Sequence, residues 1–263
     1  METRAVNPIE PALRMEGVSA GSMQDPDAIV AEGIDWTVAP GDYWVVAGLQ
    51  GSGKSDFLMM AGSLMAPRRG QYRLFGQDMP IFEEARLKER LRLGLVFDGG
   101  QLFNQLTVAE NIALPLRYHH NLSAEQAETA VRELVAAMEL APWAERVAGT
   151  LGRSWQKRVG LARALALKPE VLLVDNPLGG LDLRQVNWWL GFLEQLSRGH
   201  ALMQSRPMTL VVTAADLRPW KGRARQFAIL RDRRFTVLGD WAQLRAASEE
   251  LLHELLTERI QPE

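Results

Sequence analysis

The sequence predicts an α/β fold in which helices cover a parallel sheet. Short apolar runs, each about as long as a buried strand, recur along the chain and are separated by segments with helical spacing. These runs are Tyr43–Ala47, Leu93–Phe97, Val171–Val174, Leu210–Thr213 and Gln226–Leu230. Strands that alternate with helices build a parallel sheet, because each crossover helix returns the chain to the same end of the sheet.

Further segments extend this core. Ile29–Val38 and a short strand within Gly70–Gly76 indicate a small antiparallel layer near the amino terminus. Between residues 106 and 168 the pattern becomes helical, because Ser123 and Gln126 form a capping box and the apolar residues after them share one helical face. We expect this stretch to form a helical lobe inserted into the core.

The carboxy-terminal segment also has an apolar helical face. Its members are Leu244, Ala247, Leu251, Leu252 and Leu255. Such a face packs either against its own domain or against a second copy of the chain, and both readings stay open.

Composition limits the possible functions. The chain has 263 residues, 47% of them hydrophobic, which is enough for one domain over residues 1–263 with a substantial core. It has no cysteine, which excludes disulfides and thiolate chemistry, and its net charge of −2 predicts no nucleic-acid partner. The basic clusters at 221–225 and 231–234 are interpreted as solvated turns or as contacts with nucleic acid or lipid headgroups.

The sequence also predicts where the chain is located. Residues 1–10 lack the profile of a signal peptide, which predicts a cytoplasmic chain. No apolar run reaches the roughly 18 residues that a membrane-spanning helix needs. We therefore expect any role at a membrane to depend on a partner.

The strongest local motif is an eight-residue run that matches the phosphate-binding P-loop at every specified position. It comprises Gly48, Leu49, Gln50, Gly51, Ser52, Gly53, Lys54 and Ser55. A strand, a glycine-rich turn and a helix direct backbone N–H groups at one small volume, where the helix N-terminus adds partial positive charge. We therefore predict that the chain binds a nucleoside triphosphate, with Lys54 at the outer phosphates and Ser55 on Mg²⁺. Asp56 follows in the first helical turn of this binding segment and is interpreted as a solvent-facing cap.

A second motif ends a buried strand. The apolar run Val171–Val174 is followed directly by Asp175, which is the Walker B pattern. A carboxylate at the end of a strand near a P-loop is typical of a magnesium partner. We predict this role for Asp175, with Ser55 opposite.

Three segments around these motifs resemble one family. Residues 93–111 resemble the Q-loop region of ATP-binding cassette (ABC) ATPases, and residues 158–166 resemble the helix after their signature loop. Residues 176–182 resemble the end of Walker B and the D-loop, which contains Gly180, Leu181 and Asp182. The resemblance runs in order from about residue 13 to 244. It implies the ABC ATPase fold, which is an α/β P-loop NTPase (RecA-like) core with a small antiparallel β layer and an inserted helical lobe.

The resemblance also implies a role in transport. Residues 97–117 look most like the ATPase subunits of phospholipid-trafficking, MCE-associated transporters. We therefore expect ATP and Mg²⁺ as cofactors, a homo- or heterodimer of ATP-binding subunits, and an integral-membrane permease as partner. The chain would then be peripheral on the inner face of the cell membrane. The alternative is a non-hydrolysing ATP-sensing interaction module that dimerises on nucleotide.

Catalytic positions of the family are altered in this chain. The resemblance aligns Asn176 with the glutamate that acts on the attacking water and Ala214 with the switch histidine. An amide accepts no proton, and losing general-base help costs about 10²–10⁴ in rate. We expect weakened or partner-assisted hydrolysis beside an intact phosphate cradle, which indicates selection for binding over turnover.

Two other family positions are also altered. The signature loop aligns with Leu151, Gly152, Arg153, Ser154 and Trp155, of which only the leucine agrees. In the family this loop closes over the γ-phosphate of the opposite subunit, so Arg153 is interpreted as a phosphate ligand there, or as salt-bridged or exposed. Asp98 replaces the Q-loop glutamine and is either a ligand of ATP-bound Mg²⁺ or part of a polar Asp-Gly-Gly turn.

Overall fold

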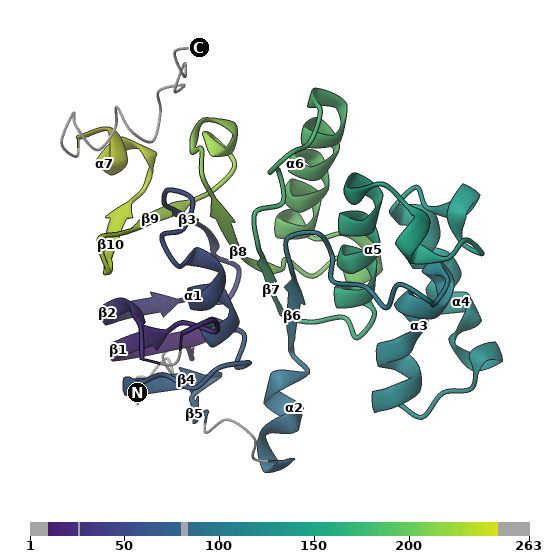
Figure 1. Cartoon of the computed structure of the whole chain (residues 1–263), viewed down its shortest axis with the longest axis horizontal. Helices are drawn as coiled ribbons and strands as arrows, with labels where there is room; N and C mark the ends of the chain where they lie inside the picture. The colour runs from purple at the N-terminus through teal and green to yellow at the C-terminus, as the bar shows by residue number, and fades with distance from the viewer. Residues whose placement is uncertain (1–9, 26, 80–83, 247–263) are drawn as a thin grey trace, which may run out of the picture.

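The computed structural model describes residues 10–25, 27–79 and 84–246, and the strands in these ranges form one sheet (Figure 1). The strands are β1 Leu13–Gly21, β2 Ile29–Val38, β3 Tyr43–Ala47, β4 Arg69–Leu74, β5 Gln77–Asp78, β6 Leu93–Val96, β7 Val171–Val174, β8 Thr209–Ala214, β9 Gln226–Arg231 and β10 Arg234–Gly239. Their spatial order is β5-β4-β1-β2-β10-β9-β3-β8-β7-β6.

The five strands predicted for the core are all present and lie side by side. They pair in parallel as β9-β3-β8-β7-β6, so their carboxyl ends meet at one edge of the sheet. Strand β8 lies between β3 and β7, with Ala47 opposite Ala214 and Val174 opposite Val212. The strand that leads into the P-loop and the strand that ends at Asp175 are therefore joined through β8.

The antiparallel layer is larger than the sequence indicated. β1 pairs with both β2 and β4, and β10 is parallel to β2 and antiparallel to β9. The prediction of a turn over residues 231–234 was wrong at both ends, because Arg231 ends β9 and Arg234 begins β10. Only Asp232 and Arg233 form the turn, with φ of 49° and 61°. The other basic cluster, 221–225, lies in turns and loop before β9.

The helices form a lobe beside the sheet and layers on its faces (Figure 1). They are α1 Lys54–Ala61, α2 Leu87–Arg90, α3 Val108–His119, α4 Ala124–Ala137, α5 Arg153–Leu165, α6 Leu183–Arg198 and α7 Trp241–Ala246. The predicted lobe contains α3, α4 and α5. Thr107 with Glu110 and Ser123 with Gln126 form complete capping boxes at the starts of α3 and α4, so both starts are fixed locally by sequence.

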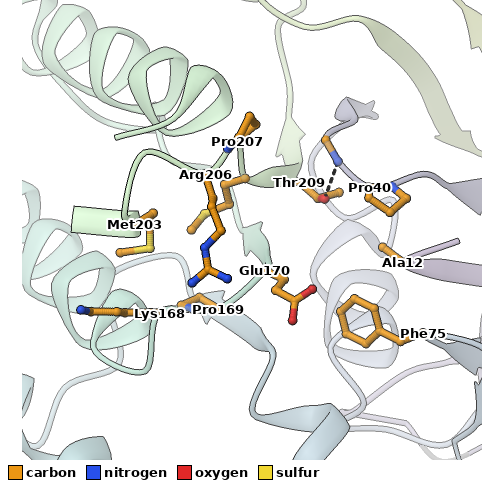
Figure 2. Close-up of a pocket in the computed structure, with 12 residues that line it drawn as sticks. Ala12, Pro40, Phe75, Lys168, Pro169, Glu170, Met203, Arg206, Pro207 and Thr209 are labelled. Atoms are coloured by element: carbon orange, nitrogen blue, oxygen red, sulfur yellow. Dashed lines mark hydrogen bonds between the residues drawn. The ribbon is translucent and has the colours of Figure 1, made fainter. Parts of the chain in front are cut away.

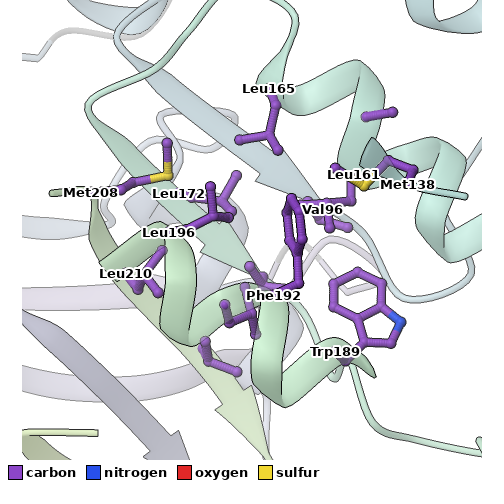
Figure 3. Packing of buried hydrophobic residues seen from close by; sticks show 14 of the residues in the cluster. Val96, Met138, Leu161, Leu165, Leu172, Trp189, Phe192, Leu196, Met208 and Leu210 are labelled. Atoms are coloured by element: carbon purple, nitrogen blue, oxygen red, sulfur yellow. The ribbon is translucent and has the colours of Figure 1, made fainter. Parts of the chain in front are cut away.

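Buried side chains form two clusters, one on each face of the sheet. Leu172 and Val174 of β7 point to the face covered by α5 and α6, while Leu173 points to the face covered by α1. Figure 3 shows the first cluster, where Trp189 and Phe192 of α6 pack near Leu161, Leu165 and residues of the sheet. The alternation follows from the two-residue period of a strand.

Helix α5 is joined to α6 by a buried cation. The Arg158 side chain is 2% exposed, and its guanidinium carbon lies 3.6 Å from the ring centre of Trp188 and 4.7 Å from that of Trp155. The same guanidinium donates to Gln185 Oε1 at 2.9 Å and to Glu139 Oε2 at 2.8 Å. Arg158 therefore contacts both α6 and Glu139, which lies two residues after the end of α4.

The carboxy-terminal prediction is tested only in part. Leu244 is buried in α7, while the other members of that apolar face lie outside the described residues. Over the described ranges, no helix combines the length and the hydropathy needed to cross a bilayer.

Candidate functional site

A cavity of about 370 Å³ lies at the carboxyl ends of β3 and β7. It is lined by Gln50, Gly51, Lys54, Ser55, Asp98, Arg153, Asp175, Asn176, Gly179, Gly180 and Ala215. The P-loop, the Walker B aspartate, the Q-loop position and one signature residue therefore meet in one place. Open α/β sheets bind ligands in such crevices outside the strand ends.

The P-loop has the backbone geometry that its sequence requires. Gly51 and Gly53 have φ of 80° and 86°, a region that glycine enters without strain. A Cβ on Gly53 would lie 2.5 Å from Val30 Cβ, so no larger residue fits there. Lys54 begins α1 and donates from Nζ to the carbonyl oxygens of Gly48 and Leu49, both at 2.7 Å. Burial lowers the pKa of Lys54, and the charge of Asp175 opposes this shift.

Asp175 is held by a residue that sequence reasoning missed. The Thr213 hydroxyl in β8 donates to Asp175 Oδ1 at 2.7 Å and accepts the Asn176 N–H at 2.9 Å. Thr213 is fully buried. The available signal was a lone polar residue in the apolar run Leu210–Ala214. Thr213 thus fixes the position of the carboxylate and of the residue after it.

The chemistry of the donors fits Mg²⁺. The Ser55 and Asp175 side chains line the same cavity, and Mg²⁺ prefers one or two such oxygens together with phosphate oxygens and water. The described part of the chain contains no group of three or more His, Cys, Asp or Glu side chains that could hold a metal ion. Phosphate oxygens and water would supply the remaining ligands of a Mg²⁺ ion held here.

Lys157, which the sequence reasoning also missed, connects three segments around the cavity. Its side chain is 1% exposed, and Nζ donates to the carbonyl oxygens of Asn176 at 2.8 Å and Gly179 at 2.9 Å. The same Nζ lies 3.0 Å from Asp98 Oδ1. The spacing of four residues from Arg153 places both cations on one face of α5, which was the signal available in the sequence. Burial lowers the pKa of Lys157, against the hydrogen bond and charge of Asp98.

Asp98 lies between two cations. Arg153 Nη2 is 3.1 Å from Asp98 Oδ2, and Asn176 Nδ2 donates to the same oxygen at 3.4 Å. Partial burial raises the pKa of Asp98, but the hydrogen bond and charge of Lys157, with the charge of Arg153, outweigh it and hold the pKa below its ordinary value. The carboxylate is also within the Asp-Gly-Gly turn, since Gly99 and Gly100 both have φ of 82°.

A second hollow lies at the other end of the same strands. It has a volume of about 140 Å³ and is lined by Glu170, Arg206, Lys168, Phe75 and Thr209, among others (Figure 2). No P-loop residue lines it. At this hollow the Gly41 N–H donates to Thr209 Oγ1 at 2.9 Å, and this hydrogen bond links the turn before β3 to the start of β8. The nucleotide motifs therefore converge at the opposite edge of the sheet.

Comparison with known proteins identifies the family of this fold and site. A family profile described as ABC transporter matches residues 31–179, more than half of the chain. The chain belongs to the ABC transporter family. Among solved structures, the dimeric bacterial ABC transporter cassette MJ0796 superposes with a TM-score of 0.73 and 25% identity over 84% of this chain and 95% of that one. The predicted ABC ATPase fold is thereby confirmed.

Curated relatives in the ABC family include the ATP-binding proteins of a methionine import system and of a lipoprotein-releasing system. The methionine import ATP-binding protein MetN of Lacticaseibacillus paracasei is 32% identical over 213 residues, covering 80% of this chain and 58% of the relative. The lipoprotein-releasing system ATP-binding protein LolD 1 of Rhodopseudomonas palustris is 32% identical over 172 residues, covering 64% of this chain and 76% of the relative. The chain spans about half the length of most of the curated relatives it matches.

The predicted catalytic positions of this ABC-family chain line the cavity or border it. Asn176 has φ of 44°, a left-handed backbone that asparagine tolerates better than most residues. Ala214 ends β8 and, with Asn176 and Trp220, lines an adjoining hollow of about 250 Å³. An amide and a methyl group occupy these two positions, so neither supplies a carboxylate or an imidazole, although Asp216 also lines the adjoining hollow.

The remaining predicted residues are distributed around the cassette. Arg153, Ser154 and Trp155 form the first turn of α5, with Gly152 as N-cap, so the expected signature loop ends earlier than its alignment indicated. Leu151 is buried before it. Of the D-loop residues, Gly180 lines the cavity, Leu181 packs on the core, and Asp182 caps α6 by accepting Gln185 N–H at 2.8 Å.

Asp56 lies on the solvent side of the P-loop helix. Its Oδ1 accepts the Met23 N–H at 3.1 Å. This contact ties the exposed segment after β1 to the first turn of α1. Asp56 is not among the residues that line the phosphate cavity.

Proposed function

We propose that this chain is the ATP-binding subunit of an ABC-type transporter that binds Mg-ATP firmly and hydrolyses it slowly or with the help of a partner. The observation that carries the proposal is the cavity in which an intact P-loop and Asp175 face Asn176, with Ala214 in the hollow that adjoins it. The binding groups are complete, whereas the groups that assist the attack of water are absent from their usual positions.

Each binding group has a defined task in this proposal. The P-loop N–H groups and the N-terminus of α1 hold the phosphates, and Lys54 leaves the Gly48 and Leu49 carbonyls to reach the outer ones. Ser55 and Asp175 hold Mg²⁺, which when bound neutralises charge on the phosphate oxygens. Thr213 keeps the Asp175 carboxylate in place.

Slow ATP hydrolysis follows from the chemistry of the residue at position 176. Asn176 orients a water at best, because its amide accepts no proton at neutral pH. Binding energy is therefore available to close two cassettes on each other, while release depends on slow turnover or on a partner's groups. Phospholipid is the cargo class proposed, on the resemblance of residues 97–117, and the partners proposed are a second cassette and a membrane permease.

Calorimetry with Mg-ATP and steady-state phosphate release test the proposal on the purified chain, with and without membrane proteins that copurify. We expect tight binding, slow release alone, and loss of binding in Lys54→Ala. Lys168→Ala is the matched control, because Lys168 lines the hollow at the opposite end of the sheet. No heat on titration with Mg-ATP would overturn the proposal. Tight binding without phosphate release in the presence of the permease would support the ATP-sensing module instead.

A further inference from the structure

Three residues in the wall of the nucleotide cavity share one partner behind that wall. Asp98, Asn176 and Gly179 line the cavity. Lys157 is only 1% exposed and is not among the lining residues. Its Nζ donates to the Asn176 and Gly179 carbonyl oxygens and lies 3.0 Å from Asp98 Oδ1. An ammonium group has three N–H donors, so all of them have protein acceptors and Lys157 acts on the cavity through its wall.

The acceptors of Lys157 belong to the sheet side of the molecule, whereas the donor belongs to the helical lobe. Asp98 lies two residues after the end of β6, and Asn176 lies two residues after the end of β7. Lys157 lies on α5, against which α3 and α4 pack. One buried ammonium therefore connects the lobe to the carboxyl ends of two neighbouring strands.

The peptide that accepts from Lys157 is itself held firmly. Asn176 has φ of 44°, and its N–H donates to Thr213 Oγ1 at 2.9 Å while its carbonyl oxygen accepts from Lys157. A Cβ on Gly179 would lie 2.2 Å from Asn176 Nδ2, so the asparagine side chain is packed closely as well. A left-handed backbone outside glycine persists where several neighbours fix it. Helix α5 is therefore fastened to a part of the sheet edge that does not shift freely.

A second cation of α5 has acceptors of a different kind. Arg163 donates through Nη2 to the carbonyl oxygens of Gly100 at 2.9 Å and Gln101 at 3.0 Å. A Cβ on Gly160 would lie 2.8 Å from Gly100 Cα, so helix and segment are in close contact there. These acceptors all follow β6. Lys157 differs from Arg163 because its bonds also extend to the loop after β7.

We propose that Lys157 is a positioning residue that sets the orientation of the helical lobe over the nucleotide cavity and, with it, the wall of that cavity. A tilt of α5 at this end would separate a buried cation from its acceptors, which costs free energy because neither side regains water. The orientation in which all three contacts are made is therefore strongly preferred. The effect on the lobe is independent of nucleotide, whereas the effect on nucleotide affinity rests on the proposed function.

Distance measurements between two spin labels test the orientation of the lobe. The chain has no cysteine, so labels attach only at cysteines that are introduced. Thr129→Cys on α4 and Thr236→Cys on β10 replace exposed residues and place one label on the lobe and one on the sheet. We expect a single narrow distance distribution in the labelled full-length chain. Lys157→Met should broaden it or shift it by more than about 2 Å, the scale of a rearrangement rather than of side-chain adjustment.

Arg163→Met is the matched control. It also removes a cation of α5 and its hydrogen bonds to two carbonyls, but it leaves the contacts with the loop after β7 in place. This control should lose stability and keep the narrow distribution. Equal broadening in both variants would overturn the inference, because any lost cation of α5 would then loosen the lobe.

Lys157→Gln covers the case in which Lys157→Met does not fold. It keeps two N–H donors on a shorter, uncharged side chain, so its distance distribution should lie between those of the natural chain and Lys157→Met. A distribution that stays narrow and unshifted when Lys157 is replaced by either residue would overturn the inference.

Calorimetry separates this inference from the proposed function. We expect Mg-ATP affinity to fall about tenfold in Lys157→Met and to stay within about twofold in Arg163→Met, because a displaced wall no longer fits the phosphates. A displaced lobe with full Mg-ATP affinity would overturn the inference, since the wall would then not depend on Lys157. Absence of Mg-ATP binding in the natural chain would instead overturn the proposed function, and the label distances would still decide the role of Lys157 in the lobe.

Discussion

The ammonium nitrogen of Lys157 lies 2.8 Å from the carbonyl oxygen of Asn176, although the first belongs to the helical lobe and the second follows the Walker B strand. The same nitrogen reaches the Gly179 carbonyl and Asp98. One buried cation therefore joins the Q-loop position, the residue after Asp175 and the approach to the D-loop. We expect a displacement of any one of these segments to disturb the contacts of Lys157 with the other two.

Lys157→Met is expected to destabilise the chain by about 3 kcal/mol, the scale for breaking a buried ion pair. Two carbonyls lose a donor and Asp98 loses its buried partner. Adding Asp98→Leu should recover part of the loss, because the unpaired carboxylate is then gone. Urea unfolding of the two single variants and the double variant measures the coupling. Strictly additive effects would contradict a direct interaction between the two side chains.

Thr213→Val is expected to weaken Mg-ATP binding about tenfold and to cost about 1–3 kcal/mol of stability, since the Asn176 N–H is left without its acceptor. Thr209→Val is the matched control. Thr209 starts the same strand, is similarly buried, and accepts the Gly41 N–H. It should lose comparable stability and keep its nucleotide affinity. Equal effects on binding from both variants would remove the special role of Thr213.

Asn176→Glu is expected to restore little hydrolysis. The residue has φ of 44°, where a glutamate costs about 1–2 kcal/mol, and its side chain lies beside Asp98, so a second carboxylate adds repulsion. Ala214 still supplies no imidazole. Phosphate release and thermal melting of this variant are the measurements. Vigorous ATP turnover from this single change would show that position 176 alone limits hydrolysis, and would contradict the idea that several altered positions limit it together.

The pKa of Asp98 sets a pH dependence of stability. Because its folded pKa lies below the unfolded value of about 3.9, the carboxylate contributes stability above that pH and loses the contribution as pH falls through the folded pKa. The difference in unfolding free energy between the natural chain and Asp98→Asn should therefore be constant from about pH 5 to 7 and shrink below about pH 4. A difference that grows in acid would contradict the ion pairs with Lys157 and Arg153.

The parts of the fold with a local signal were predictable. Buried strands and the capping box at Ser123 carry their own residue patterns, and the structure contains them. β1 and β10 were missed because the first mixes charged residues with Gly17, and the second follows a left-handed Asp232–Arg233 turn that carries no glycine. Turn signals of the usual Asn-Gly kind were absent there.

The candidate site was predictable wherever a motif is contiguous. The P-loop and Asp175 are such motifs, and they meet in one cavity. Thr213 and Lys157 act through contacts over 37 and 19 residues, respectively. Those contacts depend on the order β3-β8-β7 and on the docking of α5, which no single segment specifies. The position of Arg153 inside its own cavity depends on the same packing.

The guanidinium of Arg158, enclosed by Trp155 of α5 and Trp188 of α6, limits how this molecule can move. A hinge motion between those two helices would expose a desolvated cation and separate it from the Trp188 ring and from Gln185. Rigid-body rotation of the helical part must therefore carry α6 along, and the D-loop, which leads directly into α6, would travel with it.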